Sequence, residues 1–416
     1  MLPLAFVCLL LLRLVVDTTA TATPPPELYS PLISSKILAI AQNESDPPTY
    51  PQYTDRVAGI WQYFSPNTWT SGFFPVLQYA MNTRAELCNE SDGNSWVELG
   101  RQWSTGLIPL ETNNTLQHDV GFVSMPFQEE YYFNRMNQTA IDAITAFAAD
   151  LDARFSPIVG CTRSWDTPDE PTWFEVIIDN MMNLELLFIG ADITGNDTYR
   201  QHAISHANKT MINHIRPDGS TYHLVNYNAD TGAVISQGTH QGYSNSSTWT
   251  RGQAWGIYGF SNMFNRTRDP NYIITARRLA KYFVDHIPQD GVVPWDFNAP
   301  LYPPRPADSS AATIASAGLL FLANMEKSLT PPNNTGYDIW TRHAIQILAD
   351  TTALAWKPEW QSLLSNGTVN NPASPPNNLT GIVYGDYYYV KAGNDLISMG
   401  LAECHDHVAS RSFGSL

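Results

Sequence analysis

The sequence of 416 residues predicts an all-α protein whose helices form two concentric layers, an α/α barrel in a single domain. Segments that are apolar on every helical face alternate along the chain with amphipathic segments. A helix that is apolar all round is buried, whereas an amphipathic helix covers a core with one face. Little of the chain shows the apolar–polar alternation of a half-buried strand. The alternation of the two helix types therefore predicts an inner and an outer layer.

The first inner helix and its outer partner are expected in the middle of the chain, after an amphipathic segment at residues 141–151 with one apolar face. Residues 176–189 are apolar nearly all round, which predicts an inner-layer helix. Gly195 can end that helix and Asp197 can cap the next one. In residues 199–215 an apolar residue recurs every four positions, so this second helix is amphipathic and belongs to the outer layer.

The same pair of helices repeats further along the chain. Residues 255–264 are largely apolar, and Asp269 followed by Pro270 supplies a cap and a first-turn proline for an amphipathic helix over residues 273–287. Further helices are expected at residues 311–325, 339–356 and 387–401. Single cores usually stop growing at about 250–300 residues, so two domains must be considered. However, the only linker-like segment between residues 30 and 400 is Pro372–Pro376, too near the end to separate domains, and one domain over residues 23–416 is expected.

Residues 1–22 are predicted to be a secretory signal peptide. Leu2 to Val16 form an apolar run interrupted only by Pro3 and Arg13, and a small-residue cleavage pattern at residues 20–22 places the mature start near Thr23. No Lys or Arg precedes the run, which keeps a retained membrane anchor as the alternative. Asn-X-Ser/Thr signals point to secretion independently, and the chain is expected to be extracellular and glycosylated. These sequons are at Asn43, Asn89, Asn113, Asn137, Asn196, Asn208, Asn245, Asn265, Asn333, Asn366 and Asn378.

Charge and cysteine content exclude several classes of protein. A net charge of −16 leaves no basic stripe for nucleic acid, so an anionic substrate must be recognised by a few local donors. Once the signal peptide is removed, Cys88, Cys161 and Cys404 remain, which permits at most one internal disulfide and argues against a zinc–cysteine site. The motif His405-Asp406-His407 is terminal and has no third ligand nearby, so it does not predict a metal site.

A pocket for an acidic carbohydrate is predicted where a polar loop becomes an apolar helix. Trp249 and Trp255 offer ring faces for stacking on a sugar, and the Arg251 guanidinium between them suits a carboxylate. His223 and the run from Thr239 to Gly242 lead into this stretch with further potential ligands. Taken alone, Trp255 would be read as a core residue and Arg251 as a surface charge.

Two carboxylates stand out by their context. Asp179 is flanked almost entirely by apolar residues, and burial should make it hold its proton more tightly, as a general acid must. Asp119 follows His118, which places an imidazole beside a carboxylate. The alternative for Asp179 is a structural acid that caps a loop or pairs with Arg163 or Arg251.

Seven motifs, in a consistent order from about Trp69 to Tyr388, resemble the unsaturated glucuronyl hydrolases of glycoside hydrolase family 88. They are His118-Asp119-x-Gly121-Phe122, Ile178-Asp179-x-Met181-Met182-Asn183-Leu184, Arg216-Pro217-Asp218-Gly219-Ser220, Thr239-His240-Gln241-Gly242, Trp249-x-Arg251-Gly252-Gln253-Ala254-Trp255, Asp308-Ser309-Ser310-Ala311 and Gly385-Asp386-Tyr387-Tyr388. One departure is Val76, which stands where the family commonly has glycine.

The resemblance implies an (α/α)6 six-hairpin barrel without metal or cofactor, acting on oligosaccharides that end in a 4,5-unsaturated uronic acid. It implies that Asp179 is the general acid/base, which protonates C4 of the double bond and directs water to C5. It also implies that Asp119 is the second essential carboxylate, which holds a ring hydroxyl and tunes Asp179.

The resemblance further implies the residues that contact the substrate. Sugar contacts are expected from His118, His223, Gln241, Trp249 and Trp255. The uronate carboxylate would be held by Thr239, His240 and Arg251, and the pocket walled by Trp69 and Trp165, although both tryptophans could equally be core residues.

Three other functions compete with this one. A related hydrolase of unsaturated galacturonyl-rhamnose from pectin would share the barrel and the acid. A sugar epimerase would depend on paired histidines such as His223 and His240. A glycan-binding protein without activity would keep the aromatic residues but has no need of both acids. An acidic, secreted chain also leads us to expect a mildly acidic pH optimum.

Overall fold

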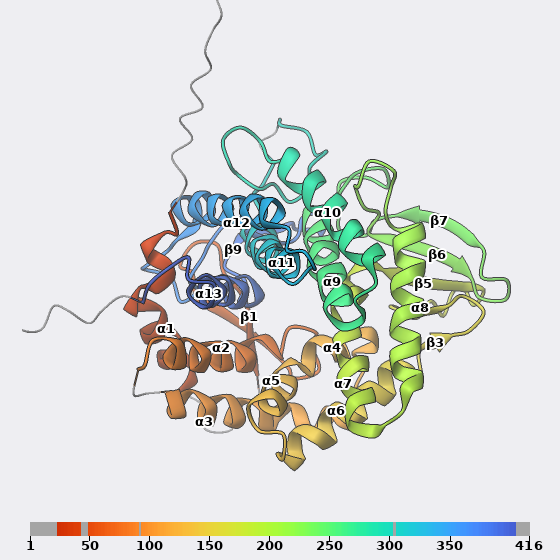
Figure 1. The fold of residues 1–416 in the computed structure, drawn as a ribbon, viewed down its shortest axis with the longest axis horizontal. Helices are drawn as coiled ribbons and strands as arrows, with labels where there is room; N and C mark the ends of the chain where they lie inside the picture. Colours follow the sequence, from red (N-terminus) through yellow and green to blue (C-terminus); the bar gives the residue numbers. More distant parts are fainter. Residues whose placement is uncertain (1–22, 43–48, 91–92, 303–304, 405–416) are drawn as a thin grey trace, which may run out of the picture.

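The structure is a computed structural model that describes residues 23–42, 49–90, 93–302 and 305–404. The predicted signal peptide, the Asn43 sequon and the motif at residues 405–407 lie outside the described residues. Within them, helices predominate, as predicted (Figure 1). No described helix is both long enough and apolar enough to cross a bilayer.

The helices and strands have the following bounds. The α-helices are α1 (Pro31–Ala41), α2 (Phe73–Leu87), α3 (Gly93–Ser104), α4 (Val120–Val123), α5 (Met125–Phe133), α6 (Gln138–Asp152), α7 (Leu184–Thr194), α8 (Asp197–Asn213), α9 (Thr250–Thr267), α10 (Pro270–Asp285), α11 (Ser309–Lys327), α12 (Asn334–Ala355) and α13 (Val383–Ser398). The 3-10 helices are η1 (Pro26–Tyr29), η2 (Thr105–Glu111), η3 (Gln117–Asp119) and η4 (Ile178–Met182). The strands are β1 (Tyr50–Thr54), β2 (Trp61–Phe64), β3 (Phe155–Ser156), β4 (Cys161–Thr162), β5 (Trp173–Ile177), β6 (Leu224–Asn228), β7 (Val234–Gly238), β8 (Gly367–Asn370) and β9 (Asn377–Thr380).

Six helical segments pack against one another in succession. The α2 helix contacts α13, α13 contacts α11, α11 contacts α9, α9 contacts η4 and α7, and α5 contacts α2 (Figure 1). Five of them also contact the helix that follows in sequence, as α11 does with α12 and α9 with α10, and α13 contacts η1. The α11 helix is buried along almost its whole length, whereas α10 buries one face only, which matches the two predicted helix types.

The predicted ends of several helices are confirmed. Asp269 caps α10 by accepting a hydrogen bond from the Asn271 amide at 2.9 Å, with Pro270 in the first turn. Gly195 ends α7 in the left-handed conformation, at φ 71°, where glycine has no steric penalty.

The prediction of one inner helix over residues 176–189 is wrong at its start. Residues 173–177 form strand β5, η4 follows, and α7 begins only at Leu184. In β5, Val176 pairs with Val225 of β6, and β6 pairs with β7 in a three-stranded antiparallel sheet. Periodicity alone cannot separate a short, continuous apolar strand from a buried helix. Asp179 therefore lies in the 3-10 helix η4 and not in the predicted α-helix.

One disulfide is formed, between Cys88 and Cys404, with a sequence separation of 316 residues. It fastens the end of α2 to the segment after α13. Cys161 on β4 is free and buried. The sequence allowed at most one internal disulfide but left the pairing open.

Candidate active site

The candidate site is built where several helical segments begin. Asp119 stands at the junction of η3 and α4, Asp179 lies in η4, and Trp249 is the N-cap residue of α9. His223 comes directly before β6, and Thr239 comes directly after β7. The first turn of a helix carries free amide groups and the positive end of its dipole, which favours an anionic ligand.

Asp179 faces the imidazole of His223. His223 Nε2 lies 3.5 Å from Asp179 Oδ2. On the other side of the ring, the His240 amide donates a hydrogen bond to His223 Nδ1 at 3.2 Å. Because Nδ1 is an acceptor here, Nε2 carries the proton of a neutral ring and points it at Asp179. The 3.5 Å contact is long for a hydrogen bond and can tighten when a substrate binds.

Asp119 faces His118 in the same manner. His118 Nε2 lies 3.4 Å from Asp119 Oδ1. The side-chain amide of Asn183 donates from Nδ2 to His118 Nδ1 at 3.0 Å and to the His118 carbonyl at 2.7 Å. This ring therefore also accepts at Nδ1 and directs its Nε2 proton to a carboxylate. Each carboxylate thus faces a histidine whose Nδ1 is held by a hydrogen bond from another residue.

The surroundings drive the two carboxyl pKa values apart. Burial, together with the nearby charge of Asp179, raises the pKa of Asp119 well above its ordinary value. Burial also acts to raise the pKa of Asp179, but the facing Nε2–H of His223 and the positive charge of the Arg251 guanidinium outweigh it, so the pKa is lowered. Burial lowers the pKa of His118 to about 3, so that ring is neutral. The prediction that burial raises the pKa of Asp179 is therefore wrong in direction, and Asp119 is the carboxyl whose pKa is raised.

Aromatic rings surround the two carboxylate–histidine pairs. The half-buried ring of Trp165 lies 6.2 Å from the His118 ring, 6.0 Å from His223 and 5.3 Å from His240, measured between centroids. Trp249 lies 4.5 Å from His223. The half-buried ring of Trp69 packs on Phe122 and Tyr384, at 5.5 and 5.0 Å. Trp69 and Trp165 keep exposed surface that can contact an apolar face of a sugar ring, whereas Trp249 is 3% exposed.

The Arg251 guanidinium is already engaged by the protein. It donates to Asp308 Oδ2 and the Thr368 carbonyl, both at 2.6 Å, and to the Val369 carbonyl at 2.8 Å. Its side chain is 1% exposed and lies over the Trp249 ring at 4.5 Å. Because the guanidinium already donates to three protein oxygens, Arg251 is disfavoured as a direct ligand of the uronate. Its position over the ring favours a role in holding Trp249.

Trp255 lies in the core beneath the site. Its side chain has no exposed surface and packs against Phe122 and Tyr388, at 5.5 and 5.6 Å. Trp255 therefore has no open ring face for the predicted sugar contact, and it is better described as a core residue.

The loop after β7 lies at the rim of the site. The His240 side chain is half exposed and lies 3.8 Å from the Glu175 carboxylate of β5. Thr239 Oγ1 accepts from the Gly242 amide at 2.7 Å, and Gln241 donates to the Val369 carbonyl at 3.3 Å. These residues remain candidates for contact with substrate.

Asn183, Asp308 and Glu175 had no assigned role in the sequence analysis. The first two lie inside the quoted motifs, but their function depends on contacts with residues far along the chain. Glu175 is a carboxylate in an apolar run, and this context is the sequence feature that could have marked it as a candidate site residue. In the part of the chain that the structure describes, no cluster of three or more His, Cys, Asp or Glu side chains could hold a metal ion.

A buried carboxyl and a half-buried one, with pKa values shifted in opposite directions and aromatic rings around them, suit acid/base chemistry on a sugar. No protein-family model matches the chain. The unsaturated glucuronyl hydrolase of Formosa agariphila is 37% identical over 328 residues, covering 78% of each chain, and that of Bacillus sp. strain GL1 is 31% identical over 329 residues, covering 78% of this chain and 85% of the other. The crystal structure of an unsaturated glucuronyl hydrolase specific for heparin superposes with a TM-score of 0.79 at 27% identity, covering 91% of this chain and all of the other. The chain belongs to the unsaturated glucuronyl hydrolases, glycoside hydrolase family 88, and is a glycosidase.

Proposed function

We propose that this protein removes the terminal 4,5-unsaturated glucuronic acid from oligosaccharides produced by polysaccharide lyases, by hydrating the vinyl ether. The observation that carries the proposal is the pair of carboxyl groups, whose pKa values are shifted in opposite directions and each of which faces the Nε2 of a fixed histidine. Hydration of an enol ether needs a proton delivered to carbon and a proton accepted from water, and one carboxyl group can do both in turn while the second positions the substrate.

The proposed reaction begins with proton transfer to C4 of the unsaturated ring. Asp179 delivers this proton, and the uronate carboxylate assists by raising the pKa of the neighbouring Asp179 when it binds. Asp119, whose own pKa is raised by burial and by the nearby charge of Asp179, holds a ring hydroxyl of the substrate and tunes Asp179. Water then loses a proton to Asp179, which the first step left ionised, as the water oxygen bonds to C5. The resulting hemiketal opens, the glycosidic bond breaks, and a 4-deoxy-5-keto uronate leaves.

The unsaturated ring is proposed to lie against Trp165, with its carboxylate near Thr239 and His240. The half-exposed His240 side chain is free to move toward the substrate. Relatives support a glucuronyl substrate: a mutant of the Streptococcus agalactiae unsaturated glucuronyl hydrolase, at 25% identity and a TM-score of 0.68, is known in complex with dGlcA-GalNAc6S.

The architecture and location complete the proposal. We infer that the successive packing of α2, α5, α7, α9, α11 and α13, each with an outer neighbour, is a six-hairpin (α/α)6 barrel. We also propose that the protein is secreted after removal of residues 1–22 and carries N-linked glycans.

Replacement of each carboxylate tests the proposal. Asp179→Asn and Asp119→Asn should each abolish the loss of double-bond absorbance on unsaturated glucuronyl disaccharides while the circular dichroism spectrum stays unchanged. Asp152→Asn is the matched control, because Asp152 also pairs with a histidine, His202 at 2.6 Å, but on α6 away from the site. Near-normal turnover by Asp179→Asn would refute the assignment of the acid.

A panel of lyase products separates the competing substrates. Fragments of glucuronan, hyaluronan, chondroitin, xanthan and pectin should be tested under one assay. Preference for the pectin product would favour the rhamnogalacturonyl alternative. Full activity of Asp179→Asn with inactive His223→Ala and His240→Ala variants would favour an epimerase.

A further inference from the structure

Glu175 is a third acid beside the two carboxyl groups described above, and the proposed reaction gives it no role. It lies on β5, shortly before Asp179, and is 7% exposed. Its carboxylate lies 3.8 Å from Nε2 of His240, which is the only ion pair that Glu175 makes with a described residue. Burying a carboxylate is costly unless a positive or hydrogen-bonding group compensates it. The other groups around Glu175 therefore decide how far it depends on His240.

The neighbours of Glu175 are engaged elsewhere. Asn226 stands opposite it on β6, but the Asn226 side chain donates from Nδ2 to a serine hydroxyl of β7 at 3.1 Å. The guanidinium of Arg163 lies over the Phe174 ring at 4.6 Å. Because successive side chains of a strand point to opposite faces, this contact places Arg163 on the face of β5 away from Glu175. The rim imidazole is thus left as the group that can compensate this carboxylate.

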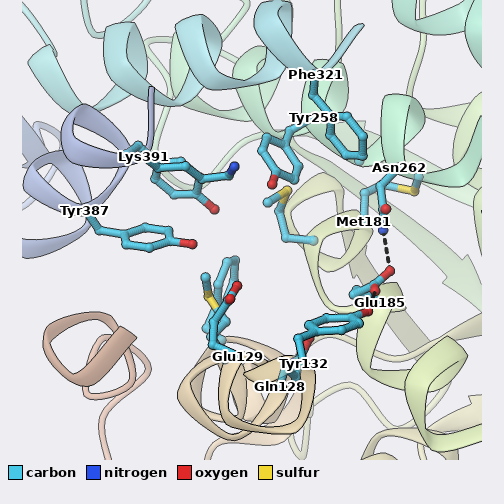
Figure 2. Close-up of a pocket in the computed structure, with 15 residues that line it drawn as sticks. Gln128, Glu129, Tyr132, Met181, Glu185, Tyr258, Asn262, Phe321, Tyr387 and Lys391 are labelled. Atoms are coloured by element: carbon cyan, nitrogen blue, oxygen red, sulfur yellow. Dashed lines mark hydrogen bonds between the residues drawn. The ribbon is translucent and has the colours of Figure 1, made fainter. Parts of the chain in front are cut away.

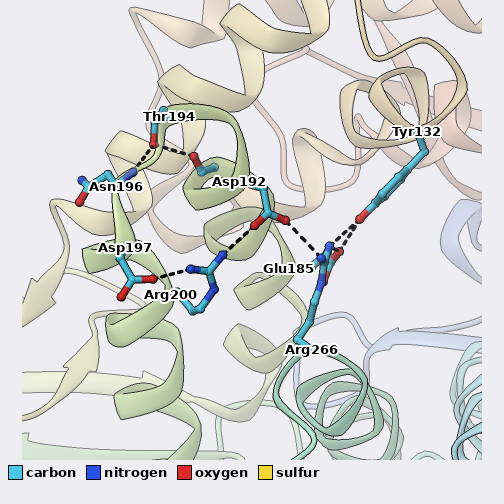
Figure 3. A network of polar contacts seen from close by, with 9 residues as sticks. Tyr132, Glu185, Asp192, Thr194, Asn196, Asp197, Arg200 and Arg266 are labelled. Carbon is cyan, nitrogen blue, oxygen red and sulfur yellow. Dashed lines mark hydrogen bonds and ion pairs between the residues drawn. The ribbon is translucent and has the colours of Figure 1, made fainter. Parts of the chain in front are cut away.

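Glu185 on α7 provides a contrast, because its charge is balanced inside the protein. It accepts a hydrogen bond from Asn262 at 2.8 Å (Figure 2). It also pairs with Arg266, which in turn contacts Asp192 (Figure 3). Glu175 has no cationic partner of this kind in the described interior, and its one ion pair reaches a half-exposed residue at the rim of the site. Glu185 is therefore a structural acid, whereas Glu175 is directed at the site.

His240 borders the place proposed for the unsaturated ring. Its ring centroid lies 5.3 Å from that of Trp165 and 6.4 Å from that of His223. A protonated imidazole donates from both nitrogens, so it can bind Glu175 through Nε2 and a uronate carboxylate through Nδ1. The present 3.8 Å separation is that of an ion pair, and it can shorten to a hydrogen bond when a substrate binds.

We propose that Glu175 is a positioning residue that acts on the substrate through His240. Its carboxylate accepts a hydrogen bond from Nε2 and orients the ring, so that Nδ1 donates to the uronate carboxylate. The imidazolium then lies between two negative charges, which strengthens its interaction with an acidic sugar. This inference rests on the proposed function, because it assigns Glu175 to binding of the unsaturated uronate.

A double-mutant cycle on Glu175 and His240 tests the proposal. KM and kcat are measured by the loss of double-bond absorbance on an unsaturated glucuronyl disaccharide. Glu175→Gln should raise KM by about three- to tenfold and leave kcat within about twofold, because substrate binding is weakened while Asp179 is untouched. In a His240→Ala background, Glu175→Gln should change KM no further, since the residue through which it acts is already gone.

Glu170→Gln is the matched control, because Glu170 is exposed in the loop before β5, and this variant should leave KM unchanged. If Glu175→Gln does not fold, Glu175→Asp carries the same cycle, since it keeps the charge on a shorter side chain. The inference is overturned if KM is normal in the Glu175 variants of an active enzyme, or if KM rises equally with and without His240, as a purely structural role predicts. An inert wild type would overturn the proposed function together with this inference.

Discussion

Replacement of Arg251 by Met tests whether this arginine holds the site together or holds the substrate. The side chain is 1% exposed and donates to one carboxylate and two carbonyl groups at 2.6–2.8 Å. Removing one partner of a buried ion pair costs about 3–5 kcal/mol, because the other charge stays buried without compensation. That charge is Asp308, which also caps α11 through the amides of Ser310 and Ala311.

The loss should be measured as the free energy of unfolding in urea, followed by tryptophan fluorescence. Arg251→Met should lower it by about 3–5 kcal/mol, and Arg251→Lys should recover little of the loss, because an ammonium cannot reproduce the planar fork. Arg278→Met is the matched control: this arginine is exposed and should change stability by less than about 0.5 kcal/mol. The structural reading fails if Arg251→Met is as stable as the wild type and only the KM for the disaccharide rises.

Three further predictions concern two buried histidines, the disulfide and the contact between Gly121 and Asn183. Burial lowers the pKa of His206 to about 3 and that of His214 to about 4, so the stability that these neutral rings confer is complete above pH 6.5 and is lost as the pH falls toward the pKa values of the folded state. The free energy of unfolding in urea should therefore be lower at pH 5 than at pH 7, by about 2 kcal/mol per histidine. His206→Asn should reduce this difference. A Cys88→Ser variant should lose about 2–5 kcal/mol in the same assay and become insensitive to reductant, whereas a reductant-sensitive variant would argue against the Cys88–Cys404 disulfide. A Cβ at Gly121 would lie 2.4 Å from the side chain of Asn183, so Gly121→Ala should displace Asn183 from His118 and lower kcat together with about 1–3 kcal/mol of stability; normal turnover would show that this support is dispensable.

The helical layers were predictable because their signal is local. Apolar periodicity and capping residues such as Asp269 and Gly195 act within one or two turns of the chain. Strand β5 was missed because its apolar run is fixed by pairing with β6, about 50 residues later, which no local pattern encodes. The same limit explains why the Cys88–Cys404 pairing stayed open.

The site was predictable in its residue types more than in its electrostatics. The structure brings His118, Asp119, Trp165, Asp179, His223 and Trp249 together around one place. The sequence showed that Asp179 is buried, but not that His223 would face it and reverse the direction of its pKa shift. Likewise, the guanidinium of Arg251 could be recognised as a carboxylate ligand, but its engagement with Asp308 depends on residues 57 positions apart.

The central claim is that the first chemical event at this site is protonation of an alkene carbon, and isotope incorporation tests it directly. The reaction with an unsaturated glucuronyl disaccharide should be run in deuterium oxide, quenched early and analysed by NMR. Hydration of the vinyl ether predicts one deuterium at C4 of the released uronate, with the double bond lost at the same rate as the sugar is released. A uronate released with its double bond intact and no deuterium at C4 would show direct cleavage of the glycosidic bond and contradict the account.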